Sequence, residues 1–117
     1  MSELLFAVDS LNKHTGYDQG LLKEMFNVFK SNYPEYFEML KERSEQNDWQ
    51  GVSEIAHRAK SAVAIMGMTT IQEEFGEIEL KTDNGDALSD FSNRMNLLES
   101  KIKIAVSQIE DYIETLS

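Results

Sequence analysis

The feature that most constrains the fold is a long, regular spacing of apolar residues near the end of the chain. Nine of them are separated alternately by three and four positions: Leu88, Phe91, Met95, Leu98, Ile102, Ala105, Ile109, Tyr112 and Leu116. This spacing places all nine on one side of a single α-helix. At about 1.5 Å per residue the helix is on the order of 45 Å long, so partner helices must lie along it to cover that side.

Shorter apolar periods predict those partner helices. Ile71, Phe75 and Ile78 predict a helix over residues 69–82, preceded by a break at Gly67. The turn signal Asp83-Asn84-Gly85-Asp86 follows it, and Asp86 is the expected N-cap of the long helix. The helix before Gly67 begins near Asp48, and its apolar side consists of Val52, Ile55, Ala56, Ala59, Ala62, Val63 and Met66.

The first third of the chain has weaker signals. We expect two short helices, one over residues 21–29 and one over residues 36–40, divided at Tyr33-Pro34 because proline suits a first helical turn. Residues 4–11 are expected to form a short leading helix. With one proline and six glycines in 117 residues, the chain is predicted to be all-α. The expected fold is an antiparallel four-helix bundle with one or two short N-terminal helices, as a single domain over residues 1–117.

Composition excludes several classes of function. A formal charge of −10 repels nucleic-acid phosphates and anionic lipid head groups, so we expect neither a nucleic acid nor a membrane as partner. The absence of cysteine excludes disulfides, zinc-thiolate sites and thiol nucleophiles. No apolar stretch approaches the roughly 20 residues that span a bilayer. We expect a soluble, cytoplasmic and monomeric protein.

The stretch AHRAKSAVAIMG, residues 56–67, is the strongest candidate for a functional site. At about 100° per residue, the apolar residues of this helix lie opposite His57, which therefore faces outward. Ser61 and Ala64, one and two turns on, are too small to cover the ring, and Lys60 supplies a nearby cation. An exposed imidazole beside a cation is suited to carrying a phosphoryl group covalently. The plainer alternative is a solvated surface histidine.

The spacing Glu54-x-x-His57 is also found in di-metal carboxylate bundles. Those sites need a second copy of the motif, and His14, the other histidine, has Leu11 three residues before it. His57 also points away from the core. We therefore expect no metal site and no bound cofactor in this chain.

The spacings around His57 resemble those of the histidine-containing phosphotransfer (Hpt) domains of multistep two-component phosphorelays. The family pattern is a histidine, a lysine three positions on, a small residue four on and a glycine ten on, which here are His57, Lys60, Ser61 and Gly67. Flanking segments resemble the family as well: residues 21–29, Pro34, Asn47-Asp48-Trp49 and residues 71–80.

The resemblance implies a role for each matching residue. His57 is the expected phosphoacceptor, through Nε2, and Lys60 is expected to stabilise the phosphoryl charge. Gly67 would permit a close approach of the chain or helix packing, and Glu79 would hydrogen bond to the ring and orient it. The alternative for Glu79 is a solvated carboxylate on the helix surface. Ser61 departs from the more common glycine, and its hydroxyl is expected to narrow the space beside the histidine.

The resemblance also implies the partners. A hybrid sensor histidine kinase and response-regulator receiver domains would exchange the phosphoryl group with His57, with Mg²⁺ bound by the receiver. Ala64, Ile65 and Met68 are expected docking residues, since transient interfaces need some apolar area, and Arg58 is expected to act there as a surface charge that affects partner choice. The alternative for Ile65 and Met68 is packing against a neighbouring helix. The chain has no glycine-rich phosphate loop, so ATP-dependent kinase activity is not expected. The alternative is an adaptor, or a regulator that binds a kinase or receiver without phosphotransfer.

Overall fold

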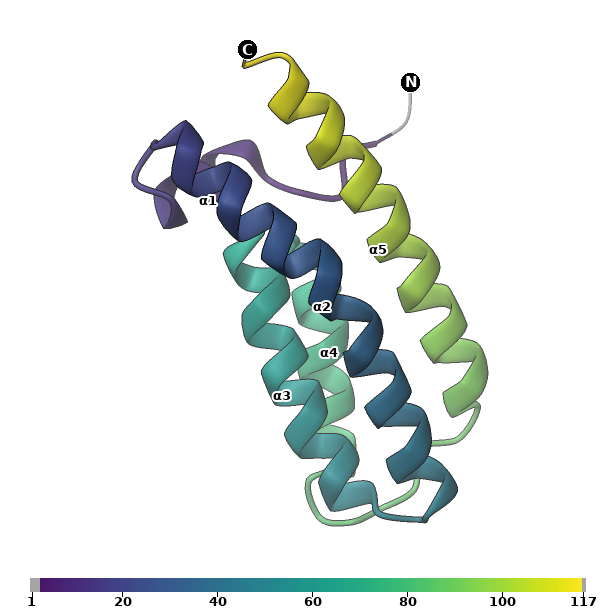
Figure 1. Cartoon of the computed structure of the whole chain (residues 1–117). Coiled ribbons are helices and arrows are strands. Elements are labelled where there is room, and N and C mark those ends of the chain that lie inside the picture. The colour runs from purple at the N-terminus through teal and green to yellow at the C-terminus, as the bar shows by residue number, and fades with distance from the viewer. Residues whose placement is uncertain (1–2, 117) are drawn as a thin grey trace.

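The structure, a computed structural model, describes residues 3–116. This part of the chain contains five α-helices and no strand. The helices are α1 (Val8–His14), α2 (Gln19–Glu45), α3 (Trp49–Ile65), α4 (Thr69–Thr82) and α5 (Phe91–Glu114). The four long helices form an elongated bundle, and the short α1 lies at one of its ends (Figure 1). The predicted all-α bundle with an additional short N-terminal helix is confirmed.

Helix α2 differs most from its prediction, because it is one continuous helix of 27 residues with Pro34 inside it. The expected division at Tyr33-Pro34 is wrong. Pro34 has no backbone N–H and so leaves one helical carbonyl without its partner. Tyr33 and Phe37, on the two sides of Pro34, are both buried in the core. Burial of this apolar side keeps the helix continuous through the proline.

The starts of two other helices were also predicted wrongly. Helix α5 begins at Phe91 with Asp90 as its N-cap, so Asp86 does not cap it. The chain turns at Gly85 (φ +86°) and crosses the end of the bundle, and Leu88 packs against the core from this loop (Figure 1). The leading helix begins at Val8, four residues later than expected, and Leu4 before it is exposed.

Helices α3 and α4 form the most extensive contact of the bundle. Helix α3 begins next to Asp48, as the sequence predicted, and the Asp48 side chain caps it by accepting a hydrogen bond from the Gly51 N–H at 2.9 Å. Gly67, at φ +73°, lies between the two helices, and its carbonyl accepts a 2.8 Å hydrogen bond from the Ala7 N–H. A Cβ atom at Gly67 would lie 2.8 Å from the Ala7 oxygen, so only glycine fits this crossing of the chain.

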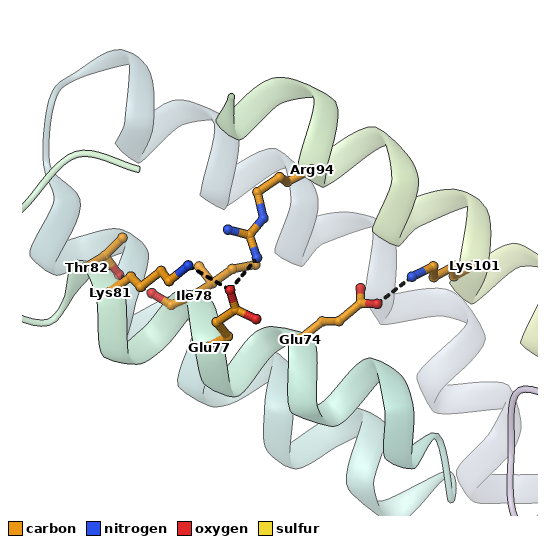
Figure 2. A network of polar contacts seen from close by, with 7 residues as sticks. All are labelled: Glu74, Glu77, Ile78, Lys81, Thr82, Arg94 and Lys101. Carbon is orange, nitrogen blue, oxygen red and sulfur yellow. Dashed lines mark hydrogen bonds and ion pairs between the residues drawn. The ribbon is translucent and has the colours of Figure 1, made fainter. Parts of the chain in front are cut away.

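Helix α5 packs against α2 and, less extensively, against α4. Polar side chains join it to α4: Lys101 contacts Glu74, and Arg94 contacts Glu77, which Lys81 of α4 also contacts (Figure 2). These pairs lie beside the buried apolar row of α5 and link α5 to α4. No helix in residues 3–116 combines the length and the apolarity needed to cross a bilayer.

Candidate functional site

His57 lies near the middle of α3 and faces away from the core, with 59% of its side chain exposed. Val52, Ile55, Ala59 and Val63, on the other side of the same helix, are buried. The outward orientation predicted from helical periodicity is therefore confirmed. The imidazole is accessible to a molecule that approaches α3 from solvent.

Glu79 of α4 determines how the ring is held. His57 Nδ1 lies 3.0 Å from Glu79 Oε2. Because a carboxylate accepts hydrogen bonds and does not donate them, this contact assigns the proton of the neutral ring to Nδ1 and leaves the lone pair on Nε2. The two ring nitrogens point in nearly opposite directions, so Nε2 is directed away from α4. The nitrogen available to react is the exposed one.

The position of Glu79 is itself fixed by contacts with α3. The Ser53 hydroxyl donates a 2.9 Å hydrogen bond to the backbone carbonyl of Glu79. Ser53 is buried, although helical periodicity alone puts it on the same side as the histidine. This bond ties the two helices together one turn before His57 and fixes the backbone from which the Glu79 side chain extends.

Lys60 contacts the other oxygen of the same carboxylate. Its Nζ atom lies 2.8 Å from Glu79 Oε1, so Glu79 bridges the lysine and the histidine. The Lys60 ammonium, together with a smaller effect of His57, holds the pKa of Glu79 below its usual value against the opposing effect of burial. Glu79 therefore stays ionised through the neutral range and faces the ring as a full negative charge.

An open polar recess lies beside His57. Its lining consists of Gln50, Ser53, Glu54, His57, Arg58, Glu79 and Asp83. Asp83 was not predicted as a site residue, although its spacing of four residues from Glu79 places both on one side of α4. Ser61 takes no part in this lining, and its hydroxyl donates to the backbone carbonyl of His57 at 3.3 Å. The hydroxyl is thus turned toward the helix backbone.

The expected docking residues do not all lie on the surface. Ile65 is 37% exposed and Ala64 is partly exposed, but Met68 is completely buried. The docking role expected for Met68 is wrong, because the chain leaves the helix at Gly67 and turns the Met68 side chain into the core. Ile65 instead borders an apolar groove between α2 and α3, which includes Leu21, Met25, Val28, Ala62 and Met66.

The family model for the Hpt domain matches residues 24–117, which is most of the chain. The chain belongs to the Hpt domain family. The match includes His57, Lys60, Gly67 and Glu79, whereas α1 lies outside it. Hpt domains act in histidine phosphotransfer within phosphorelays, where they interact with receiver domains and kinases. No curated protein and no solved structure matches this chain.

The alternative of a metal site has no geometric support in the part of the Hpt domain that the structure describes. Residues 3–116 contain no group of three or more histidine, aspartate and glutamate side chains arranged to hold a metal ion. In place of the Glu54-x-x-His57 pairing, the His57 ring contacts Glu79. The site is thus an exposed imidazole held by one carboxylate.

Proposed function

We propose that this Hpt domain carries a phosphoryl group between two receiver domains. It accepts the group on His57 from an aspartyl phosphate of one receiver and passes it to an aspartate of another. The observation that carries the proposal is the pairing of an exposed ring with Glu79 at Nδ1. That pairing leaves a nucleophilic Nε2 facing solvent, where a partner can reach it.

The transfer step follows from this arrangement. The Nε2 lone pair forms a bond to phosphorus while the bond from phosphorus to the aspartyl oxygen breaks, and the electron pair of that bond leaves on the aspartate carboxylate. The ring then has a phosphoryl group on Nε2 and a proton on Nδ1, so it is positively charged. The Glu79 carboxylate faces that charge at Nδ1 and stabilises the phosphorylated ring.

The return step reverses these bond changes. An aspartate oxygen of the second receiver attacks phosphorus, and the electron pair of the N–P bond returns to Nε2. Phosphoryl transfer depends mainly on in-line positioning and on neutralising charge. Mg²⁺ bound by the receiver supplies part of that neutralisation, and a cation on α3 near His57 adds to it. In this proposal the Hpt domain brings no ATP site and acts in the cytoplasm as a monomer.

Docking uses the exposed surface of α3 and the groove beside it. Arg58 follows His57 directly on α3 and Ala64 lies two turns further on. Ile65 leads into the apolar groove toward α2. A receiver that covers the groove would bury apolar side chains at the centre of the contact and leave charged residues at its edge. This position brings the receiver onto the same side of α3 that presents Nε2.

The proposal is tested by a relay assembled from purified parts. One receiver carries aspartyl phosphate, a second receiver carries none, and transfer between them is followed with and without the Hpt domain. We expect transfer only when wild-type protein is present, and none with His57→Gln. Transfer that persists with His57→Gln would leave a binding adaptor as the better account. Loss of transfer with a substitution of His14, the other histidine, would point to a different acceptor.

A further inference from the structure

The two cations nearest His57 in sequence extend to opposite sides of it. Counting about 100° per residue around α3, Arg58 leaves the helix about 100° to one side of His57 and Lys60 about 60° to the other. Lys60 is on the side of α4, where it contacts Glu79. Arg58 lines the recess in front of the histidine, whereas Lys60 does not. Since Nδ1 is turned toward α4, Nε2 is directed away from Lys60.

Arg58 also differs from the other arginines in its partners. Arg43 is paired with Asp48 and Arg94 with Glu77. Within residues 3–116 the Arg58 guanidinium has no hydrogen bond and no ion pair. Even Glu54, one turn before it on the same helix, is beyond ion-pair distance. An arginine beside an accessible nucleophile is therefore free to bind an anion.

The charges of the recess show why such a cation is needed. Glu54, Glu79 and Asp83 all line it, and Arg58 is the only cation among the lining residues. A phosphoryl group on a protein carries close to two negative charges near pH 7. Lys60 is already engaged by Glu79, so Arg58 is the unpaired cation of this recess that can meet a phosphoryl group on Nε2.

We propose that Arg58 binds the phosphoryl oxygens on His57 Nε2, while Lys60 mainly keeps Glu79 in place at Nδ1. The inference extends the proposed function, because it assigns the group that meets the phosphoryl charge in that same site. A guanidinium presents several N–H donors in one plane and can contact two phosphoryl oxygens together. Arg58 is then a catalytic residue, and Lys60 is a positioning residue.

The first test needs no partner protein. Phosphoramidate phosphorylates accessible imidazoles directly, with ammonia as the leaving group, and ³¹P NMR then follows ionisation of the phosphoryl group with pH. Loss of a cation beside that group raises its pKa. We expect Arg58→Gln to raise it by about half a unit or more, and Lys60→Gln to raise it less. Lys103→Gln, which removes one charge from the exposed surface of α5, is the matched control.

The proposal would be overturned if the pKa of the phosphoryl group were the same in Arg58→Gln as in Lys103→Gln. A larger shift for Lys60→Gln than for Arg58→Gln would also overturn it. The chemical reagent keeps this test separate from the proposed relay. If phosphoramidate labels His57 but no receiver does, the relay proposal fails while the role of Arg58 can still be measured.

The second test separates phosphoryl binding from docking. Transfer from a phosphorylated receiver is measured in single turnovers, at receiver concentrations high enough to saturate the Hpt domain. We expect Arg58→Gln to slow the saturated rate about fivefold with little change in the receiver Kd, and Arg58→Lys to recover part of the rate. A weaker Kd with an unchanged saturated rate would make Arg58 a docking residue only and would contradict the proposal.

Discussion

At the scale of single residues, the site depends on one carboxylate that serves two neighbours. Glu79 contacts His57 at Nδ1 and Lys60 at Nζ, so one side chain selects the ring proton and also binds the nearby cation. His57 and Lys60 could be singled out from helical spacing and from the family resemblance, whereas Glu79 could be expected from the resemblance alone. The burial of Met68 could not be predicted, because a rotation of about 100° per residue applies only within a helix and the chain leaves the helix at Gly67.

The ion pairs of Glu79 predict how stability depends on pH. The pKa of Glu79 is lowered in the folded protein, chiefly by Lys60. A lowered pKa gives stabilisation that is complete above the unfolded-state pKa and is lost as pH falls through the folded-state value. We expect the difference in unfolding free energy between wild type and Glu79→Gln to be constant near neutral pH and to shrink on acidification below the usual carboxyl range.

Urea unfolding at a series of pH values measures that difference directly. Glu77→Gln is a useful comparison, because Glu77 is also ion-paired on α4 but faces α5 and not the histidine. The pKa of Glu77 is lowered too, mainly by Lys81 and Arg94. The contribution of Glu77 to the free energy of unfolding should therefore also shrink on acidification, whereas Glu77→Gln should leave phosphotransfer unchanged. A Glu79 contribution that grows as the pH falls through the carboxyl range would contradict the assigned ion pairs.

At the scale of helices, tertiary packing overrides the local preference of proline. The rule that proline begins a helix predicts a break at Pro34, yet α2 continues because Tyr33 and Phe37 bury apolar area on both sides of it. The helices with uninterrupted periods, α3 and α4, were predicted closely. The start of α5 was predicted wrongly. Leu88 fits the apolar period of the helix, but it packs against the core from the loop that precedes α5.

Substitution of Pro34 tests this balance. Pro34 is exposed, so Pro34→Ala restores a backbone N–H without removing a core contact. A proline inside a helix destabilises the folded protein by about 3 kcal/mol. Replacement by alanine removes this cost, but it also makes the unfolded chain more flexible, which offsets part of the gain in stability. We expect the free energy of unfolding to rise by about 1–2 kcal/mol. A fall in that free energy on urea unfolding would show that Pro34 is needed for the path of α2.

At the scale of the whole molecule, the long apolar period of the last third predicts the bundle, but not how tightly each helix is held. Helices α3 and α4 make the most extensive contact, and the contacts of α5 with α2 and α4 are less extensive. The link of α5 to α4 depends partly on ion pairs that are only partly buried (Figure 2), and such pairs contribute little individually. Sequence periodicity determines which side of each helix is buried. How firmly each helix is held depends on its packing against the others, which periodicity does not show.

Hydrogen exchange measures the resulting order of stability. We expect the central amides of α5 to exchange severalfold faster than those of α3 and α4, through openings that release α5 while the site between α3 and α4 stays formed. Raising the salt concentration should increase the difference, because it screens the pairs between α4 and α5. Equal protection of all three helices would show that the bundle opens only as a unit.

The measurement that tests the central claim most directly is transfer of labelled phosphate from a receiver aspartyl phosphate to wild type, His57→Gln and His14→Gln. Both histidines are exposed, so His14→Gln is a matched control. We predict label that is stable in base and lost in acid on wild type and on His14→Gln, and none on His57→Gln. Label on His57→Gln, or none on a correctly folded wild type with several receivers, would contradict the account.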